Sequence, residues 1–456
     1  MLVRDLAQLA TPAGSEAPLR GAALANVEVV RDAYVLCENG RITAFGSMRK
    51  LRPGLGEAQG EVEELDGRGL CAVPGLVDCH THACFAGDRV DDFELRATGA
   101  SYEALHAAGG GILATVRATR SAGERGLAEA VRRHRGWMRR AGTTTFEAKS
   151  GYGLDQETEL ASLRAIREAG GLATWLGAHA VPPEFSSAAA YLEFALADVL
   201  PQAARLAVAA DVFLEEGAFD VDEARRYLEA CRAAGLALRL HGDQFTEQGA
   251  IPLAVELGAR SVRYLEACRA AGLALRLHGD QFTEQGAIPL AVELGARSVD
   301  HLEATSDAGV GMLAASAVVG VLLPVSALFL GRPMPPARAL VDAGAAIALA
   351  TDFNPGSSFC ESLGVVSSLA VTQLHLSPAE ALAACTVNAA HVVGLAARVG
   401  RIAPGYTADL VLLDAPDWRY LSYHLGADLV AAVVEAGEIT WQRAAGRSEP
   451  KRPALG

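Results

Sequence analysis

Two histidines stand at the end of an apolar run in the first third of the chain, in the stretch Leu-Val-Asp-Cys-His-Thr-His that ends at residue 82. Successive side chains of a β-strand point to opposite faces, so His80 and His82 point the same way. Their Cα atoms lie about 6–7 Å apart in an extended strand, which allows both imidazoles to bind one metal ion. Cys79 would face away from both rings, and we interpret it as part of the core. A His-x-His pair often occurs without a metal. It therefore indicates a metal site only if other strands supply further ligands.

Further polar side chains stand at the ends of later apolar segments. They are Lys149 and Tyr152, His179, His241 or its copy His278, His301 and Asp352. A lone histidine at a strand end is usually a satisfied polar residue, but several histidines and an aspartate together are difficult to explain as packing. Three imidazoles and one carboxylate form a site suited to Zn²⁺, with water completing the coordination.

The elements that must position these residues alternate between strand and helix from residue 73 to about residue 400. The expected strands cover residues 75–82, 143–149, 173–179, 210–215, 236–241, 298–302, 318–325 and 346–352, and helical patterns cover 126–142, 156–169 and 220–235. Strands that alternate with helices of this length form a parallel sheet. Eight such units predict an α/β fold with a TIM-like (β/α)8 barrel over residues 73–400. The active site of such a barrel lies at the carboxyl ends of the strands, where the polar side chains stand.

The two ends of the chain have a different pattern, with short β-rich segments separated by turns. These segments are 26–30, 33–37 and 41–45 near the amino terminus and 408–413 and 429–434 near the carboxyl terminus. We expect residues 1–72 and 401–456 to form one composite small domain, a β-sandwich that flanks the barrel.

An identical tandem repeat interrupts the count of strands. Residues 226–262 and 263–299 have the same sequence, 37 residues each, and each copy contains the fifth strand of the barrel. Counting both copies gives nine strands, which an eight-stranded barrel cannot hold without changing its shear. We therefore expect that one copy is extruded or that the barrel is damaged. His241 is the ligand if the extra block leaves before strand six, and His278 is the ligand if it leaves before strand five. The first copy is synthesised earlier, which favours His241 slightly.

Composition limits the class of partner and the compartment. The chain has 456 residues and a net charge of −14, without a basic cluster, so we expect no nucleic-acid partner. Eight cysteines without Cys-x-x-Cys spacing, and no signal peptide pattern, predict reduced thiols in the cytoplasm. Residues 308–331 carry no charge, but Gly320 and Pro324 interrupt them. We interpret this run as a helix followed by a buried strand, not as a membrane span.

Several motifs together resemble the amidohydrolase superfamily and, more narrowly, the imidazolonepropionase family. The broader resemblance rests on the stretch 74–82, the histidine of strand five, Asp300-His301 and Asp352. The narrower one rests on residues 85–89 (FAGDR), 99–102 (GASY), 108–112 (AGGGI), 149–153 (KSGYG), 177–184 (GAHAVPPE) and 351–357 (TDFNPGS). The resemblance covers nearly the whole chain.

This resemblance implies the hydrolysis of 4-imidazolone-5-propanoate to N-formimidoyl-L-glutamate in L-histidine degradation, by attack of a metal-activated hydroxide on the ring amide carbon. It implies one metal ion, Zn²⁺ in first place and iron as the alternative, and a homodimer. The implied ligands are His80, His82, His241 or His278, and Asp352. Asp352 would also accept the proton of the water, His301 would orient the water or stabilise charge, and Gln244 would position substrate or water. The residues implied for the small-molecule substrate are Arg89, which suits the propionate, and Tyr152, His179, Asn354, Gly356 and Ser357.

Alternative interpretations remain open at this point. Arg89 can be a surface ion pair with Asp91 or Asp92, and Lys149 can serve Glu147 structurally. The runner-up function is a related amidohydrolase or aminohydrolase on another cyclic amide or amidine, which would give Arg89 no carboxylate to bind. A third hypothesis is a metal-free barrel that acts as a scaffold.

Overall fold

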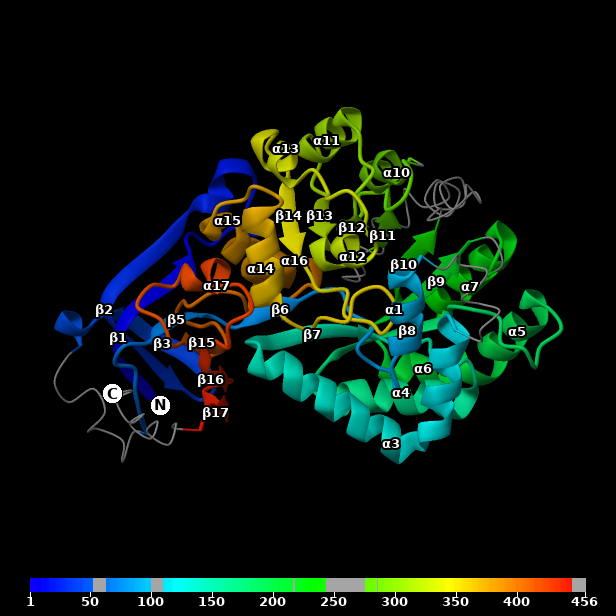
Figure 1. Cartoon of the computed structure of the whole chain (residues 1–456), viewed down its shortest axis with the longest axis horizontal. Coiled ribbons are helices and arrows are strands. Elements are labelled where there is room, and N and C mark those ends of the chain that lie inside the picture. Colours follow the sequence, from blue (N-terminus) through cyan, green and yellow to red (C-terminus); the bar gives the residue numbers. More distant parts are fainter. Residues whose placement is uncertain (52–62, 100–109, 216–217, 243–274, 285, 445–456) are drawn as a thin grey trace, which may run out of the picture.

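Nine parallel strands form a nearly closed barrel in the part of the chain that the computed structural model describes, residues 1–51, 63–99, 110–215, 218–242, 275–284 and 286–444 (Figure 1). In sheet order they are β6 (Leu76–Asp78), β7 (Thr143–Lys149), β8 (Leu172–Ala178), β9 (Ala209–Leu214), β10 (Ala237–Gly242), β11 (Arg276–Gly279), β12 (Ser298–His301), β13 (Val319–Leu322) and β14 (Ala346–Leu349). An isolated parallel bridge between Thr81 and Phe353 joins the chain just beyond β6 to the chain just beyond β14. The expected barrel is confirmed.

The expected number of eight strands is wrong, and so is the expected extrusion of one copy of the repeat. Both copies of strand five lie in the sheet: β10 pairs with β9 on one side and with β11 on the other, and β11 pairs with β12. The physical reason is that the two copies have the same sequence, so each is equally suited to a buried position in the sheet. Placing both in the sheet satisfies their backbone groups and buries Leu240 and Leu277. The barrel gains circumference instead of expelling a strand.

Helices connect most of these strands and cover the outside of the barrel. Helix α3 (Ile112–Arg140) packs on α4 (Gln156–Glu168), and α7 (Val221–Ala233) packs on β9. Asp155 and Asp220 accept hydrogen bonds from the first turns of α4 and α7, which explains where these two helices begin. The other described helices of the barrel include α1 (Val90–Ala97), α5 (Ala188–Phe194), α6 (Leu200–Leu206), α10 (Ala287–Glu293), α11 (Asp307–Ala314), α12 (Pro324–Phe329), α13 (Ala337–Asp342), α14 (Leu363–Thr372), α15 (Pro378–Ala383) and α16 (Ala389–Val392).

Strands from both termini form a second sheet, drawn in blue and red at one end of the molecule in Figure 1. Its members are β1 (Leu2–Pro12), β2 (Val27–Glu38), β3 (Arg41–Ser47), β4 (Glu64–Asp66), β5 (Cys71–Pro74), β15 (Leu410–Leu413), β16 (Val430–Glu435) and β17 (Glu438–Gln442). They belong to one hydrogen-bonded sheet, where a sandwich was expected, and a bridge between Arg41 and Thr407 curls β3 back towards β15. The domain limits of 1–72 and 401–456 stay a prediction, and β5 spans the first of them.

The uncharged segment at residues 308–331 contains α11, β13 and α12 and does not form one long helix. Val319 and Val321 of β13 are fully buried in the barrel, as the sequence predicts for a strand of a parallel sheet. No helix among the described residues is long and apolar enough to span a membrane.

Candidate active site

Three histidines meet inside the barrel, at the carboxyl ends of two strands. His80 and His82 follow β6, and His241 stands near the end of β10. Their ligand nitrogens lie within 4.8 Å of one another, and all three side chains are buried. The ring centroids are 5.7 to 5.9 Å apart, so the rings surround a common point without stacking. This is the geometry of a group that can hold a metal ion.

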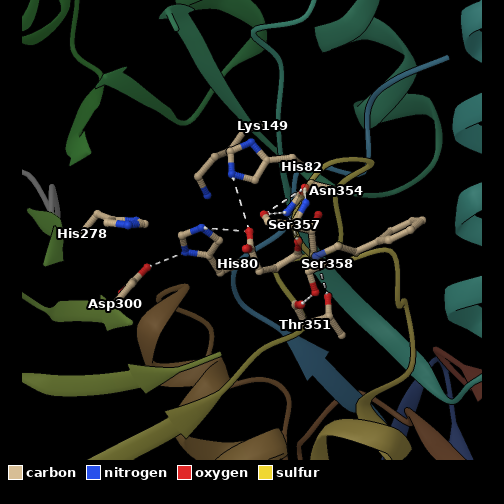
Figure 2. A network of polar contacts seen from close by, with 12 residues as sticks. His80, His82, Lys149, His278, Asp300, Thr351, Asn354, Ser357 and Ser358 are labelled. Carbon is tan, nitrogen blue, oxygen red and sulfur yellow. Dashed lines mark hydrogen bonds and ion pairs between the residues drawn. The ribbon is translucent and has the colours of Figure 1, made fainter. Parts of the chain in front are cut away.

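Carboxylates behind two of these rings fix which nitrogen faces the centre. The Nδ1 of His80 donates to Asp300 Oδ2 at 2.6 Å, and the Nδ1 of His241 donates to Asp211 Oδ1 at 2.8 Å. Figure 2 shows the first of these contacts. The Nε2 atoms of both rings are buried, and neither has a hydrogen-bond partner in the described part of the chain. Burial lowers the pKa of His80 well below its usual value, so the ring is neutral with a lone pair on Nε2. Buried nitrogens that lack a described hydrogen-bond partner fit a metal ion.

Asp352 completes the group from the opposite edge of the sheet. Its Oδ1 lies 3.8 Å from the Nε2 of both His80 and His82. The backbone N–H of Asp352 donates to the carbonyl of His80, and its φ of +53° is a left-handed conformation. This conformation is strained for a non-glycine residue, and such strain is often found at functional sites. Burial raises the pKa of the Asp352 carboxyl, which makes it a stronger proton acceptor.

His278, the copy of His241, is also inside the barrel. Its ring centroid lies 4.6 Å from that of His241 and 6.4 Å from that of His80. Its Nε2 is 3.1 Å from Gln281 Oε1, and its buried Nδ1 has no hydrogen-bond partner within the described ranges. Within the described residues no carboxylate bonds to this ring as Asp211 bonds to His241, so the two copies are not equivalent. Gln244 lies outside the described residues.

His301 closes the site on the side of β12. Its Nδ1 is 3.2 Å from Glu303 Oε1, and its ring centroid lies 3.9 Å from that of His278 and 6.3 Å from that of His80. Burial on its own would lower the pKa of His301, but the carboxylate of Glu303 outweighs it and raises that pKa. The ring is therefore held towards its charged form. Its φ of +89° is a second strained backbone position beside the three histidines.

The loop after β7 presents Tyr152 and supports His179. Glu159 of α4 accepts backbone N–H groups from Gly151 at 3.0 Å, Gly153 at 2.8 Å and Leu154 at 3.1 Å, which fixes the loop. His179 Nδ1 donates to the carbonyl of Gly151 at 2.9 Å, so its Nε2 is unprotonated when the ring is neutral. The rings of Tyr152 and His179 are 5.3 Å apart and lie 6.4 and 5.9 Å from that of His82. Burial lowers the pKa of His179 to about 4.

Arg89 stands at the start of α1 with a side chain that is 17% exposed. Its Nε pairs with Asp92 at 2.7 Å, so the ion pair with Asp92 exists, although it is mostly buried and not a surface contact. A Cβ at Gly356 would lie 2.6 Å from Arg89 Nη1, so a larger residue there would displace the end of the Arg89 side chain. The guanidinium therefore reaches the loop after β14 with its outer nitrogens.

That loop is held by its own asparagine. Asn354 Oδ1 accepts the backbone N–H of Gly356 at 2.8 Å and that of Ser357 at 2.7 Å, and its Nδ2 donates to the carbonyl of Asp352. Figure 2 shows Asn354 and Ser357 turned towards each other near His82. Asn354 thus shapes the loop, which places Gly356 beside Arg89.

The contact of Lys149 with Glu147, which the sequence suggested for a structural role, is present. Its Nζ lies 2.9 Å from Glu147 Oε2, and both side chains are buried. Arg239 pairs with the same carboxylate. Burial on its own would raise the pKa of Glu147, but Arg239 and Lys149 lower it to about 2.

The residues that orient the histidines were not predicted from the sequence. Asp211 and Asp300 were part of predicted strands but had no assigned role. A charged residue inside a strand that is otherwise apolar, as at Asp211, is the signal that could have revealed them. Glu159 and Glu303, which hold a loop and a ring, carry no such signal because helices and turns commonly contain glutamate.

Comparison with known proteins agrees with this geometry. The model of the amidohydrolase family matches residues 71–439. The chain belongs to the amidohydrolase family. The imidazolonepropionase of Rubrobacter xylanophilus is 56% identical over 447 residues, which cover 96% of this chain and 97% of that protein. The imidazolonepropionase of Herpetosiphon aurantiacus is 40% identical, and 96% of each chain is covered. The expected family is confirmed.

Solved structures show the same fold in more distant proteins. A guanine deaminase from C. acetobutylicum with bound guanine has a TM-score of 0.65 at 15% identity, and the match covers 96% of this chain and 99% of that chain. The guanine deaminase of E. coli has a TM-score of 0.62 at 16% identity, covering 97% and 100%. At these identities the likeness concerns the fold alone.

Proposed function

We propose that this chain is a hydrolase of the imidazolonepropionase type, which opens the ring of 4-imidazolone-5-propanoate to N-formimidoyl-L-glutamate in L-histidine degradation. Relatives with this name at 56% and 40% identity over nearly the whole chain support the proposal. The observation that carries it is the buried group of His80, His82 and His241, whose nitrogens converge opposite Asp352.

The donor set fits one metal ion, held by His80, His82, His241 and Asp352. Three imidazole nitrogens and one carboxylate suit Zn²⁺, which we propose in preference to iron. When bound, such an ion lowers the pKa of a water molecule and polarises a carbonyl. Metal analysis of the purified protein tests this assignment, and a folded protein without any stoichiometric metal would contradict it.

The side chains around this group have different roles in the hydrolysis. Asp352 accepts the proton of the attacking water, because burial raises the pKa of its carboxyl. The water oxygen adds to the ring amide carbon, the C–N bond breaks, and the released nitrogen takes up the proton that Asp352 accepted. His301, held towards its charged form by Glu303, stabilises the negative charge that develops on the carbonyl oxygen. Tyr152 and His179 flank the ring of the substrate.

The propionate arm defines the substrate, and Arg89 is the group that binds it. A planar guanidinium pairs with a carboxylate through two nitrogens, and the Nε of Arg89 is already directed to Asp92. The Nη groups next to Gly356 are then the ones that meet the substrate.

Incubation with 4-imidazolone-5-propanoate tests the function directly, because opening of the ring removes its ultraviolet absorbance. We expect loss of absorbance with the wild-type protein and a fall of at least a hundredfold in rate with Asp352→Asn, which keeps the shape and removes the base. Absence of turnover by metal-loaded wild-type protein would refute the proposal.

Location and assembly are further parts of the proposal. Cys37, Cys71, Cys79, Cys84, Cys231, Cys360 and Cys385 are all free thiols. Free thiols in this number suit a reducing compartment, and we propose the cytoplasm. We propose a homodimer on the family resemblance, which a measurement of mass in solution would test.

A further inference from the structure

The two copies of the repeated strand lie side by side in identical register. Arg239 is the Cα partner of Arg276, and Leu240 is the partner of Leu277. Residues that are partners on neighbouring parallel strands point to the same face, so both arginines enter the interior of the barrel below the histidines. Both are buried. Two chemically identical side chains therefore stand in two different environments.

Their polar partners are not the same. Arg239 pairs with Glu147, which also has Lys149 as a cation partner. Arg276 makes three hydrogen bonds: Nε to Ser298 Oγ at 3.1 Å, Nη1 to the carbonyl of Cys79 at 2.9 Å, and Nη2 to Asp300 Oδ2 at 2.6 Å. The first and third of these partners are on the neighbouring strand β12, whereas Cys79 follows β6.

Two of these bonds act on the same metal ligand, His80. Cys79 is the residue before it, so the bond to the Cys79 carbonyl holds the backbone of His80 in place. Asp300 Oδ2 accepts both from Arg276 and from the Nδ1 of His80, so the same guanidinium fixes the carboxylate that orients the ring. We infer that Arg276 is a positioning residue for His80, acting through Asp300 and the Cys79 carbonyl, and that its twin Arg239 does not share this role. This inference rests on the metal site of the proposed function.

The interior around the two arginines is tightly packed, which leaves their side chains little freedom to move. A cavity of about 10 Å³ remains among His80, Lys149, Arg239, Arg276 and other interior residues, which is room for about one water molecule. Burial alone would lower the pKa of Arg276, but the charge of Asp300 outweighs it and raises that pKa, whereas the pKa of Arg239 is lowered by burial. The carboxylate that holds Arg276 is the one that also contacts the Nδ1 of His80.

The repeat supplies a matched control, because the same substitution can be made twice in the same local sequence. Arg276→Lys keeps the charge, but an ammonium group cannot bond to two separate acceptors as a planar guanidinium does. In Arg239→Lys, by contrast, the ammonium group can still pair with the single carboxylate of Glu147. We expect Arg276→Lys to weaken Zn²⁺ binding about tenfold in competition with a chelator, and Arg239→Lys to weaken it less than threefold. The Co²⁺-loaded Arg276→Lys protein should also show a changed visible spectrum. Equal effects of the two substitutions, or wild-type affinity for Arg276→Lys, would overturn the inference.

Asp300→Asn tests the route and covers the case in which Arg276→Lys does not fold. It should weaken Zn²⁺ binding by a similar factor, since a neutral amide orients His80 less strongly. In the double variant, Arg276→Lys should add less than twofold, because both residues act on one ring. Full additivity, or wild-type affinity for Asp300→Asn alone, would contradict the inference. These readouts measure metal binding only, so a wild-type protein that binds Zn²⁺ but leaves the imidazolone intact would refute the proposed function and not this role of Arg276.

Discussion

At the scale of single residues, the proposed role of Arg89 is to bind the propionate of the substrate. Arg89→Ala should raise KM for the propionate substrate by roughly 10- to 100-fold, since hydrogen bonds to a charged group contribute about 1.5–3 kcal/mol. Arg89→Lys should give an intermediate KM, because an ammonium replaces a planar fork. Steady-state kinetics on the three proteins measure the effect. An analogue with a methyl group in place of the propionate is the control, and it should not distinguish them. An unchanged KM in Arg89→Ala would contradict the substrate assignment.

The repeated histidines allow a second test at this scale. His241→Ala should remove most of the bound metal, because His241 belongs to the group of three and is oriented by Asp211. His278→Ala should retain metal at close to one ion per chain, since in the described part of the chain His278 bonds to Gln281 and to no carboxylate. Elemental analysis after dialysis compares them. Equal loss from both variants would mean that the two histidines share the ion.

The sequence alone predicted the histidines that come together better than it predicted the residues that support them. The spacing of His80 and His82 follows from the period of a strand and needs no tertiary information. The contact of His80 with Asp300 joins residues 220 positions apart, and it depends on the register of several strands. Arg276 could not be separated from Arg239 by sequence at all, because only the neighbours of β10 and β11 distinguish them.

At the scale of elements, apolar periodicity predicted β7 and α4 to within one residue, because each has an unambiguous pattern. The strand β1 was missed. Its sequence contains charged residues and a bulge between Val3 and Leu6, which breaks the alternation on which such predictions depend. Its pairing with β2, β4 and β5 is what makes it a strand.

The junction between the two sheets contains a carboxyl group that predicts a pH effect. Asp409 precedes β15, accepts the backbone N–H of Ala436 at 2.8 Å, and accepts that of Gly75 through its carbonyl. Burial raises the pKa of Asp409 from 3.8 to about 6. An acid with a raised folded-state pKa contributes its full stabilisation below its unfolded-state pKa, and this contribution is lost as pH rises through about 6.

Asp409→Asn removes the ionisable group and therefore the loss of stability as pH rises. The asparagine keeps a side-chain oxygen that can accept the backbone N–H of Ala436. Relative to wild type, the variant should gain free energy of unfolding between pH 4 and pH 8, on the order of 2 kcal/mol. Urea unfolding at the two pH values measures the gain. A difference between the two proteins that does not change with pH would show that Asp409 does not titrate in this range.

At the scale of the whole molecule, the barrel accommodates a duplicated strand because each copy satisfies a different neighbour. His241 of β10 meets Asp211 of β9, and Arg276 of β11 meets Asp300 of β12. In an eight-stranded barrel one strand would lie between β9 and β12 and would serve both. In the duplicated chain, β10 and β11 therefore share the contacts that a single strand would make.

Deletion of one copy tests this division on the whole chain. Removal of residues 226–262 or of residues 263–299 gives the same shortened sequence, so a single variant represents an eight-stranded form. We expect it to fold and to bind one metal ion, because its one remaining histidine can be oriented by Asp211 while its one arginine reaches Asp300. Circular dichroism and metal analysis measure this outcome. Replacing that remaining histidine by alanine should then abolish binding. A shortened chain that folds but holds no metal would show that the second copy has become indispensable to the site.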